Sequence, residues 1–262
     1  MPSDLYIGLM SGTSLDGVDA VLADFSAATP IVGSYYAPMP EPMRAEVAAL
    51  LRPGADELNR GALLGNELGT LYAQAVRCLL DASGKAAEEI AAIGCHGQTV
   101  RHCPERGFTI QLVNGALVAE RTGIAVVCDF RSRDVAAGGE GAPLVPAFHA
   151  AMFRHPSIDR AVVNLGGIAN ITCLPCRGSV RGFDCGPANA LLDEWAERHL
   201  GSPYDAGGRW PAAGRVLPDL LSAFMADPFF RRRPPKSTGR DYFNLEWAHA
   251  HIGSSLAPQD VQ

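Results

Sequence analysis

Residues 12–19 combine side chains and backbone that could bind a phosphate group. Gly12 and Gly17 lie in a segment that also contains Ser14, Asp16 and Asp19. Glycine lets the backbone approach a ligand closely, successive N–H groups can converge on an anion, and hydroxyl groups add donors. Because the segment contains no lysine, we expect Asp16 or Asp19 to hold a Mg²⁺ ion against the phosphate, directly or through water. An ordinary Asp-Gly hairpin is the alternative interpretation.

The spacing of Gly12 and Gly17 also matches the glycine frame of a P-loop, but the P-loop interpretation fails. That motif requires Lys and then Ser or Thr directly after the second glycine, and a helix must follow. Here Val18 and Asp19 follow, and residues 18–25 form an apolar run typical of a strand. The segment is therefore predicted to be a turn between two strands, the first of which begins at Leu5 and ends near Gly8.

A second glycine turn, Gly166-Gly167, lies between two apolar runs at residues 160–165 and 168–174. The order strand, glycine turn, strand repeats the organisation of residues 5–24, although the two sequences differ. Two such turns at the heads of two α/β domains could bind a polyphosphate from opposite sides. A Rossmann interpretation is weak because a strand rather than a helix follows the glycines.

Asp184 ends a predicted strand over residues 180–184 and precedes a glycine-containing turn. A carboxylate in this position is well placed to act as a general base. Capping of the following helix, predicted over residues 187–200, is the alternative role.

Polar side chains also follow two predicted strands in the first half of the chain. Thr99 belongs to the segment after residues 90–95, and Arg133 belongs to the segment after residues 124–128. Ligands of open α/β sheets bind at the carboxyl ends of strands, so both side chains are candidates for binding a polar ligand. A surface salt-bridge group is the alternative for Arg133.

The elements that position these residues indicate an α/β fold. A long helix is predicted from Asp56 toward Ala82, with Leu58, Leu64 and Leu68 among the apolar residues of one face. A glycine- and proline-rich segment over residues 138–146 favours a domain boundary. We therefore predict a first domain over residues 1–137 and a second domain over residues 138–262.

Composition narrows the class of protein. The chain has 262 residues, a formal charge of −6 and a pI near 5.6, which argue against binding to nucleic acid or to an anionic membrane. No stretch approaches the apolar length of a membrane span. Seven scattered cysteines fit a reducing compartment better than a disulfide framework. We expect a cytoplasmic protein.

Six motifs in order resemble those of the anhydro-N-acetylmuramic acid kinases, a family of the actin, hexokinase and heat-shock-70 superfold. The resemblance implies a two-domain, actin-like ATPase (ribonuclease H-like) fold with an interdomain cleft. The motifs are Gly8-Leu-Met-Ser-Gly-Thr-Ser-Leu-Asp-Gly-Val-Asp19, Gly97-Gln-Thr-Val-Arg-His102, Asp129-Phe-Arg-Ser-Arg-Asp134, Asn164-Leu-Gly-Gly-Ile-Ala-Asn170, Gly182-Phe-Asp-Cys-Gly-Pro187 and Pro235-Lys-Ser-Thr-Gly-Arg240.

The resemblance implies an ATP-dependent reaction with Mg²⁺ that converts 1,6-anhydro-N-acetylmuramate and water to N-acetylmuramate 6-phosphate in the recycling of peptidoglycan. By family analogy, Asp184 activates the water and contacts the substrate, and Thr99 and Arg133 contact the sugar. The residues expected to bind ATP are Gly12, Thr13, Ser14, Leu15, Asp16, Gly17, Val18 and Asp19, together with Gly166 and Gly167 of the second turn.

One departure from the family concerns length. Members of the family continue beyond the position of Gln262, so the second domain is expected to be incomplete. This leaves two competing functions open: a non-catalytic product that binds sugar or forms a homodimer, and an actin-like or chaperone-type ATPase. Thr99 and Arg133 argue against the ATPase because it has no small acceptor to bind.

Overall fold

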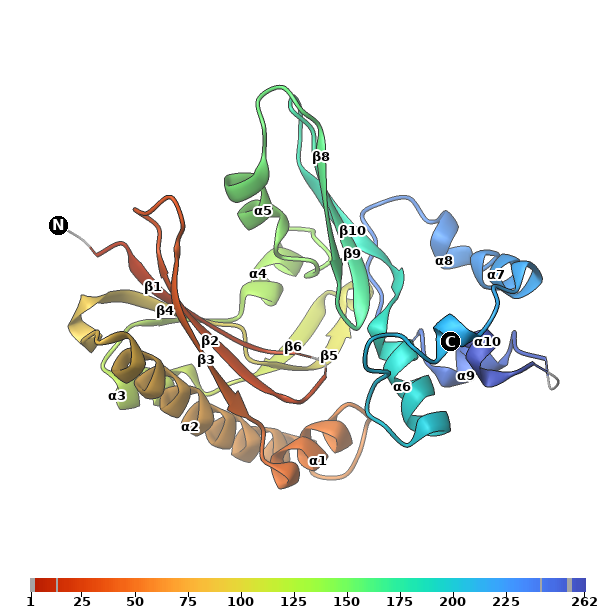
Figure 1. The fold of residues 1–262 in the computed structure, drawn as a ribbon. Helices are drawn as coiled ribbons and strands as arrows, with labels where there is room; N and C mark the ends of the chain where they lie inside the picture. Colours follow the sequence, from red (N-terminus) through yellow and green to blue (C-terminus); the bar gives the residue numbers. More distant parts are fainter. Residues whose placement is uncertain (1–2, 13, 241, 254–255) are drawn as a thin grey trace. The chain divides into compact units, whose positions relative to one another are not determined.

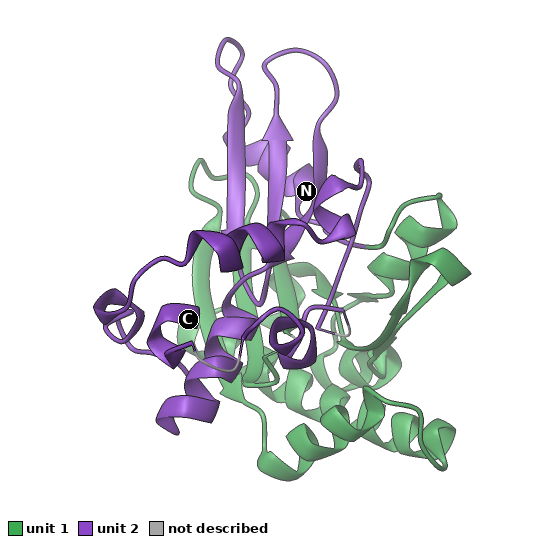
Figure 2. Ribbon diagram, turned by 90° about the vertical axis from the view of Figure 1, so that its right-hand side faces the viewer, with its two compact units in different colours: residues 1–141 green, residues 142–262 purple. Residues whose placement is uncertain are grey.

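The computed structural model describes residues 3–12, 14–240, 242–253 and 256–262. They form two compact units, residues 1–141 and residues 142–262 (Figures 1 and 2). Both units contain helices and strands, so the protein belongs to the mixed α/β class. Whether these units are the two predicted domains stays a proposal.

Unit 1 contains a five-stranded mixed sheet. Its strands are β3 (Ile31–Pro38), β2 (Gly17–Asp24), β1 (Leu5–Ser11), β4 (Ile90–Cys95) and β7 (Val126–Val127), in that order. The first three are antiparallel, whereas β4 runs parallel to both β1 and β7. The predicted strand, turn and strand are confirmed, but β1 continues past Gly8 because Ser11 still pairs with Val18.

Helix α2 (Glu57–Ser83) packs on β2 and β3 and covers one face of the sheet (Figure 1). Its buried face recurs every three or four residues, as an amphipathic helix requires, through Leu64, Leu68, Tyr72, Val76 and Leu79. Leu58 was wrongly predicted to belong to this face, since its side chain is 90% exposed. The shorter helices α1 (Glu41–Leu50) and α3 (Gly115–Thr122) pack against α2.

The segments that follow the predicted strands at residues 90–95 and 124–128 have regular secondary structure. Residues 98–103 form strand β5 (Gln98–Cys103), which pairs with β6 (Phe108–Leu112) in a separate two-stranded sheet. Residues 130–136 form helix α4 (Phe130–Ala136), which contacts β6. Thr99 therefore lies in a strand and Arg133 in a helix, where local hydrogen bonds fix the backbone of each. Two single-turn 3₁₀ helices, η1 (Ala87–Glu89) and η2 (Pro104–Arg106), complete the unit.

Unit 2 is built on an antiparallel sheet of three strands in the order β10 (Arg181–Pro187), β9 (Ile168–Leu174) and β8 (Arg160–Leu165). Helix α5 (Pro146–Phe153) packs on β9, and α6 (Asn189–Leu200) follows β10. The predicted strands at residues 160–165 and 168–174 are confirmed. Strand β10 continues to Pro187, so Asp184 lies within the strand rather than at its end.

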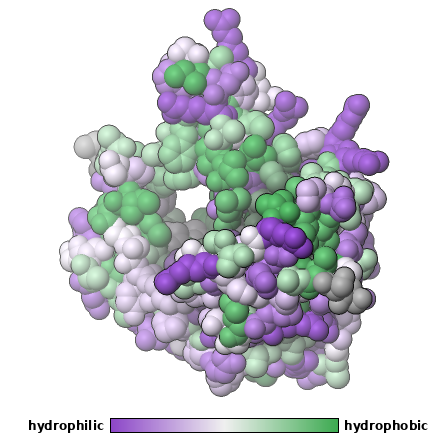
Figure 3. Space-filling model, turned by 45° about the vertical axis from the view of Figure 1, so that its right-hand side comes forward, coloured by the Kyte–Doolittle hydropathy of each residue, from purple (hydrophilic) through white to green (hydrophobic). Residues whose placement is uncertain are grey.

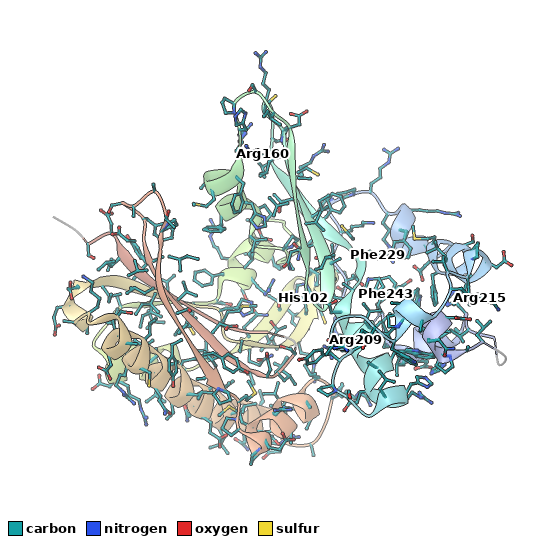
Figure 4. The ribbon with its side chains drawn as sticks, viewed as in Figure 1. His102, Arg160, Arg209, Arg215, Phe229 and Phe243 are labelled. Atoms are coloured by element: carbon teal, nitrogen blue, oxygen red, sulfur yellow. The ribbon has the colours of Figure 1, made fainter. Side chains whose placement is uncertain are left out.

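Short helices and an aromatic cluster fill the rest of unit 2. Phe229 and Phe243 are almost fully buried, and their ring centroids lie 5.3 Å apart (Figure 4). The helical segments are η3 (Pro211–Ala213), α7 (Pro218–Met225), α8 (Pro228–Arg231), α9 (Leu245–His249) and α10 (Pro258–Val261).

Large apolar side chains also reach the surface, where Figure 3 shows hydrophobic areas beside hydrophilic ones. Those exposed on β8 include Val163 and Leu165, at 56% and 65%. No helix among the residues that the structure describes is long and apolar enough to cross a membrane.

Candidate active site

The phosphate turn, residues 12–16, connects β1 to β2 in unit 1. Thr13 was predicted to contact ATP and lies outside the described residues. Leu15 is buried at a left-handed φ of 58°, a conformation that is costly for a branched side chain and that fixes the shape of the turn. The N–H of Leu15 donates to the carbonyl of Gly12 at 3.4 Å, and the N–H of Met39 donates to the carbonyl of Asp16 at 2.8 Å. The turn is therefore held to unit 1 by its own backbone.

Glycine is needed at positions 12 and 17 for different physical reasons. A Cβ atom at Gly17 would collide with the carbonyl oxygen of Ala37 and with the ring of Tyr36, so packing of β2 on β3 requires glycine there. A Cβ atom at Gly12 would meet Ser14 at ordinary contact distances, 3.5 Å from its side-chain oxygen and 3.9 Å from its backbone nitrogen. Packing in unit 1 does not require glycine at position 12, whereas close approach of a ligand to the backbone would.

The charges of Asp16 and Asp19 both act on one neighbouring side chain, that of Tyr36. Burial raises the pKa of the Tyr36 phenol, and the negative charges of Asp16 and Asp19 raise that pKa further. Both aspartates are exposed, and the Ser14 hydroxyl donates to the Asp16 carboxylate.

The described residues include no group of three or more His, Cys, Asp or Glu side chains that could hold a metal ion. Mg²⁺ commonly takes one or two carboxylates and completes its coordination with phosphate oxygens and water. The pair formed by Asp16 and Asp19 fits that pattern when a nucleotide supplies the remaining ligands.

Two buried polar side chains tie the phosphate turn to the interior of unit 1. The Tyr72 hydroxyl lies 2.6 Å from the Ser11 hydroxyl, and Ser11 in turn donates to the carbonyl of Gly97 at 3.4 Å. Burial raises the pKa of Tyr72, so its phenol keeps its proton and donates. The amide of Gln98 donates to the carbonyl of Gly12 at 3.3 Å. The start of β5 therefore supports the turn.

Thr99 and Arg133 both lie in unit 1, on elements that contact β6. The Thr99 hydroxyl accepts a hydrogen bond of 3.2 Å from Gln111 of β6, while Arg133 is exposed on α4. The Ser132 hydroxyl of α4 donates to the carbonyl of Thr109 in β6 at 3.4 Å. A hydroxyl group and a guanidinium are thus presented by one substructure.

Arg101, two residues after Thr99 in the same motif, has a structural role. Its guanidinium forms an ion pair of 3.0 Å with Glu57 at the start of α2 and donates to the carbonyl of Leu50 at the end of α1. These bonds connect β5 to the segment between the two helices.

His96 and Arg131 position helix α4. The Nε of Arg131 donates to Nε2 of His96 at 2.7 Å, so His96 carries its proton on Nδ1 and donates from there to the carbonyl of Gly97 at 2.6 Å. Burial and the neighbouring Arg131 charge lower the pKa of His96 to about 4. The imidazole is therefore neutral near pH 7 and accepts from the arginine two residues before Arg133.

The second turn, Gly166 and Gly167, joins β8 to β9 in unit 2. The N–H of Ala188 donates to the carbonyl of Gly167 at 3.1 Å, and the N–H of Asn189 donates to that of Gly166 at 3.0 Å. The Asn189 side chain adds a bond of 2.8 Å to the carbonyl of Leu165. The carbonyl groups of the turn thus point to the start of α6, which fixes the turn.

Asp184 of unit 2 is 5% exposed, and hydrogen bonds hold its carboxylate in place. One carboxylate oxygen accepts from the Ser237 hydroxyl at 2.8 Å and from the N–H of Thr238 at 3.0 Å. The register of β10 on β9 shifts between Asp184 and Gly186, and such bulges redirect side chains near functional sites. Gly186 has a φ of 150°, and a Cβ there would lie 2.7 Å from the Phe230 ring.

Asn170 of β9 is the cross-strand partner of Asp184. Residues paired in this way present their side chains to the same face of a sheet. The Oδ1 atom of Asn170 is buried and makes no hydrogen bond to the described residues. An acceptor atom is thus available beside the carboxylate.

Sequence reasoning missed several of these residues. Ser237 and Lys236 belong to a motif that was recognised but was given no role, because only the folded chain brings that motif beside Asp184. Asn170 was likewise part of a motif without a role. The alternation of β9 and the pairing of two predicted strands could have placed Asn170 opposite residue 184.

Comparison with known proteins agrees with the motifs. The family model described as "Anhydro-N-acetylmuramic acid kinase" matches residues 4–262. A protein of that name from Nitrosospira multiformis is 56% identical over 265 residues, which cover 100% of this chain and 72% of the relative. Another from Nitrosomonas europaea is 54% identical over 260 residues, which cover 98% of this chain and 72% of the relative.

Among solved structures, a reductive activator for a corrinoid, iron-sulfur protein aligns with a TM-score of 0.41 at 14% identity, over 70% of this chain and 31% of that one. The ethanolamine utilization protein EutJ from Carboxydothermus hydrogenoformans aligns with a TM-score of 0.36 at 15% identity, over 78% of this chain and 59% of that one. On the family match and the identity to these relatives, the chain belongs to the anhydro-N-acetylmuramic acid kinase family.

Proposed function

We propose that this chain converts 1,6-anhydro-N-acetylmuramate, water and ATP to N-acetylmuramate 6-phosphate and ADP, in the recycling of peptidoglycan. Family membership supports the reaction. The observation that carries the chemistry is the carboxylate of Asp184, which is buried, redirected by a bulge and held by two donors. A carboxylate fixed in this way suits a general base that acts on water.

In the proposed step, Asp184 takes a proton from a water molecule as the water oxygen bonds to the anomeric carbon. The bond from that carbon to the bridging O6 breaks, and O6 bonds to the γ-phosphorus as ADP leaves. The available Oδ1 of Asn170 would accept the second hydrogen of the water and orient its lone pair. Positioning of this kind supplies much of the rate in phosphoryl transfer.

ATP is assigned to the two glycine turns. The phosphate turn offers backbone close to a ligand at Gly12. The second turn offers Gly166, whose Cβ would meet the Asn164 side chain at 3.5 Å and the Ile168 carbonyl oxygen at 3.6 Å, both ordinary contact distances. Asp16 and Asp19 would hold Mg²⁺ at the phosphates, and the bound ion would neutralise the charge that develops during transfer. We propose that both turns bind one nucleotide in an actin-like arrangement of two domains with a cleft.

The sugar is assigned to Thr99 and Arg133 of unit 1 and to Asp184 of unit 2. A hydroxyl group and an exposed guanidinium match the hydroxyl and carboxylate groups of a muramic acid. The use of ATP is consistent with a cytoplasmic reaction. Homodimer formation stays a prediction.

The test is turnover by the purified 262-residue chain with ATP, Mg²⁺ and the anhydro sugar, followed by ³¹P NMR. In water labelled with ¹⁸O, we expect the label on the anomeric hydroxyl and the phosphate on O6. The matched control is N-acetylmuramate, which lacks the anhydro bridge and should give no comparable phosphorylation. Absence of sugar phosphate with the anhydro substrate, or ATP hydrolysis without sugar, would contradict the proposal.

A further inference from the structure

We propose that residues 236–238, the positioning segment, hold the carboxylate of Asp184 in its reactive orientation, with the buried ammonium of Lys236 as their anchor. The inference rests on the proposed function because it gives Asp184 the role of the base. It adds Ser237 and Lys236 as positioning residues.

Three hydrogen bonds join the positioning segment to Asp184. The N–H of Asp184 donates to the carbonyl of Lys236 at 3.1 Å. The Ser237 hydroxyl and the N–H of Thr238 both donate to Oδ2 of the carboxylate, at 2.8 and 3.0 Å. The positioning segment thus binds both the backbone and the side chain of Asp184. Rotation of the carboxylate would break two bonds to a charged acceptor, which are stronger than neutral ones.

Lys236 fixes the positioning segment to the aromatic cluster. Lys236 is 8% exposed, and its ammonium donates to the carbonyl of Phe229 at 3.1 Å and lies 4.5 Å from the centroid of the Phe229 ring. The Phe183 ring, on the residue before Asp184, lies 5.9 Å from the same ammonium. Both distances are within the range of cation–π interactions. One buried cation therefore contacts both α8 and β10.

Phe229 is itself held in place by a buried carboxylate, that of Asp227. Asp227 accepts from the N–H of Phe229 at 2.8 Å, from Trp247 Nε1 at 2.9 Å and from the Tyr242 hydroxyl at 3.0 Å. Burial acts to raise the pKa of Asp227, but these hydrogen bonds outweigh it and the pKa is lowered. The path from Asp227 through Phe229 and Lys236 to Asp184 consists of hydrogen bonds and cation–π contacts within unit 2, and it acts as one rigid support.

The first experiment compares steady-state kinetics of Ser237→Ala, Ser237→Thr and the wild type, with Ser222→Ala as a control at an exposed serine of α7. Loss of one hydrogen bond to a charged group should lower kcat about 10- to 100-fold. The KM values for ATP and sugar should change less than about twofold, because the hydroxyl acts on the base rather than on a substrate. Ser237→Thr should restore most of kcat, and Ser222→Ala should match the wild type.

Unchanged kcat in Ser237→Ala would overturn the proposal, as would a change confined to KM or a Ser237→Thr variant as slow as Ser237→Ala. If the wild type makes no sugar phosphate, the proposed function fails, and a second measurement still decides the inference.

That measurement is hydrogen exchange at the Thr238 amide, read by NMR in the full chain. We expect a protected amide in the wild type and exchange at least about tenfold faster in Lys236→Met and in Asp184→Ala. The control is Lys85→Met, because Lys85 is the other lysine of the chain and belongs to unit 1. Rapid exchange in the wild type, or equal exchange in wild type and Lys236→Met, would contradict the anchor. Should Lys236→Met fail to fold, Asp184→Ala and Ser237→Ala decide the result.

Discussion

Acidification should destabilise the protein through His96, and the size of the effect follows from its environment. The pKa of His96 is lowered from 6.5 to about 4 by burial and by Arg131. Because the folded pKa lies below the unfolded one, the unfolded state binds the proton first. The stability contributed by neutral His96 is therefore fully present above about pH 6.5 and is lost as pH falls toward about pH 4.

The magnitude can be worked out for a drop from about pH 7.5 to about pH 5. At about pH 5 the unfolded imidazole is almost fully protonated and the folded one is mostly neutral. The linkage relation then gives a loss of about 2 kcal/mol in the free energy of unfolding. Protonation also converts the acceptor Nε2 into a donor that faces the donor Nε of Arg131, which breaks the bond that positions α4.

The assay is urea unfolding of wild type and of His96→Gln at both pH values. Glutamine offers an acceptor to Arg131 but does not titrate, so its stability should fall by about 2 kcal/mol less than that of the wild type. The comparison cancels the contributions of groups common to both proteins. Equal losses of unfolding free energy in the two proteins would show that burial does not lower the pKa of His96. A larger loss in His96→Gln would show that His96 stabilises the protein in acid, the opposite of the prediction.

The remaining predictions concern the phosphate-binding half of the site. Gly17→Ala should lower the melting temperature, measured by thermal unfolding, because its Cβ would collide with backbone. Gly12→Ala and Gly166→Ala should keep the melting temperature and raise the KM for ATP. A lower melting temperature with an unchanged KM for ATP in these two variants would remove the reason for assigning the turns to the nucleotide. Asp16→Ala and Asp19→Ala should raise the Mg²⁺ concentration needed for half-maximal turnover and leave the affinity for the sugar, measured by calorimetry, unchanged. Weaker sugar binding with normal nucleotide binding would show that these carboxylates bind the sugar instead.

Local patterns predicted much of the fold. The apolar runs on either side of the glycine turns at residues 12 and 166 predicted both hairpins. Helical periodicity predicted α2 with Gly84 at its end, where φ is 62°. Leu58 was assigned to the buried face because it is apolar and correctly spaced, but its side chain in the first turn of α2 is 90% exposed. Periodicity indicates which residues can share a face, and only packing decides how far burial extends.

The candidate site was predicted less completely, because its residues depend on contacts distant in sequence. Asp184 could be proposed from its position after an apolar run, but its two donors lie 53 and 54 residues further along the chain. Arg101 belongs to the same motif as Thr99, but it forms an ion pair with Glu57, a contact that the motif does not reveal. Neither outcome follows from spacing alone.

The most direct test of the account is the turnover of Asp184→Asn with ATP and the anhydro sugar, measured beside the wild type. Asparagine keeps the shape of the side chain but removes its basicity, so kcat should fall about 10²- to 10⁴-fold while the KM values change little. Near-normal turnover would contradict the assignment of Asp184 as the base. Asp134 would then be the next candidate, although its carboxylate already accepts from the N–H of Gly141 at 2.8 Å.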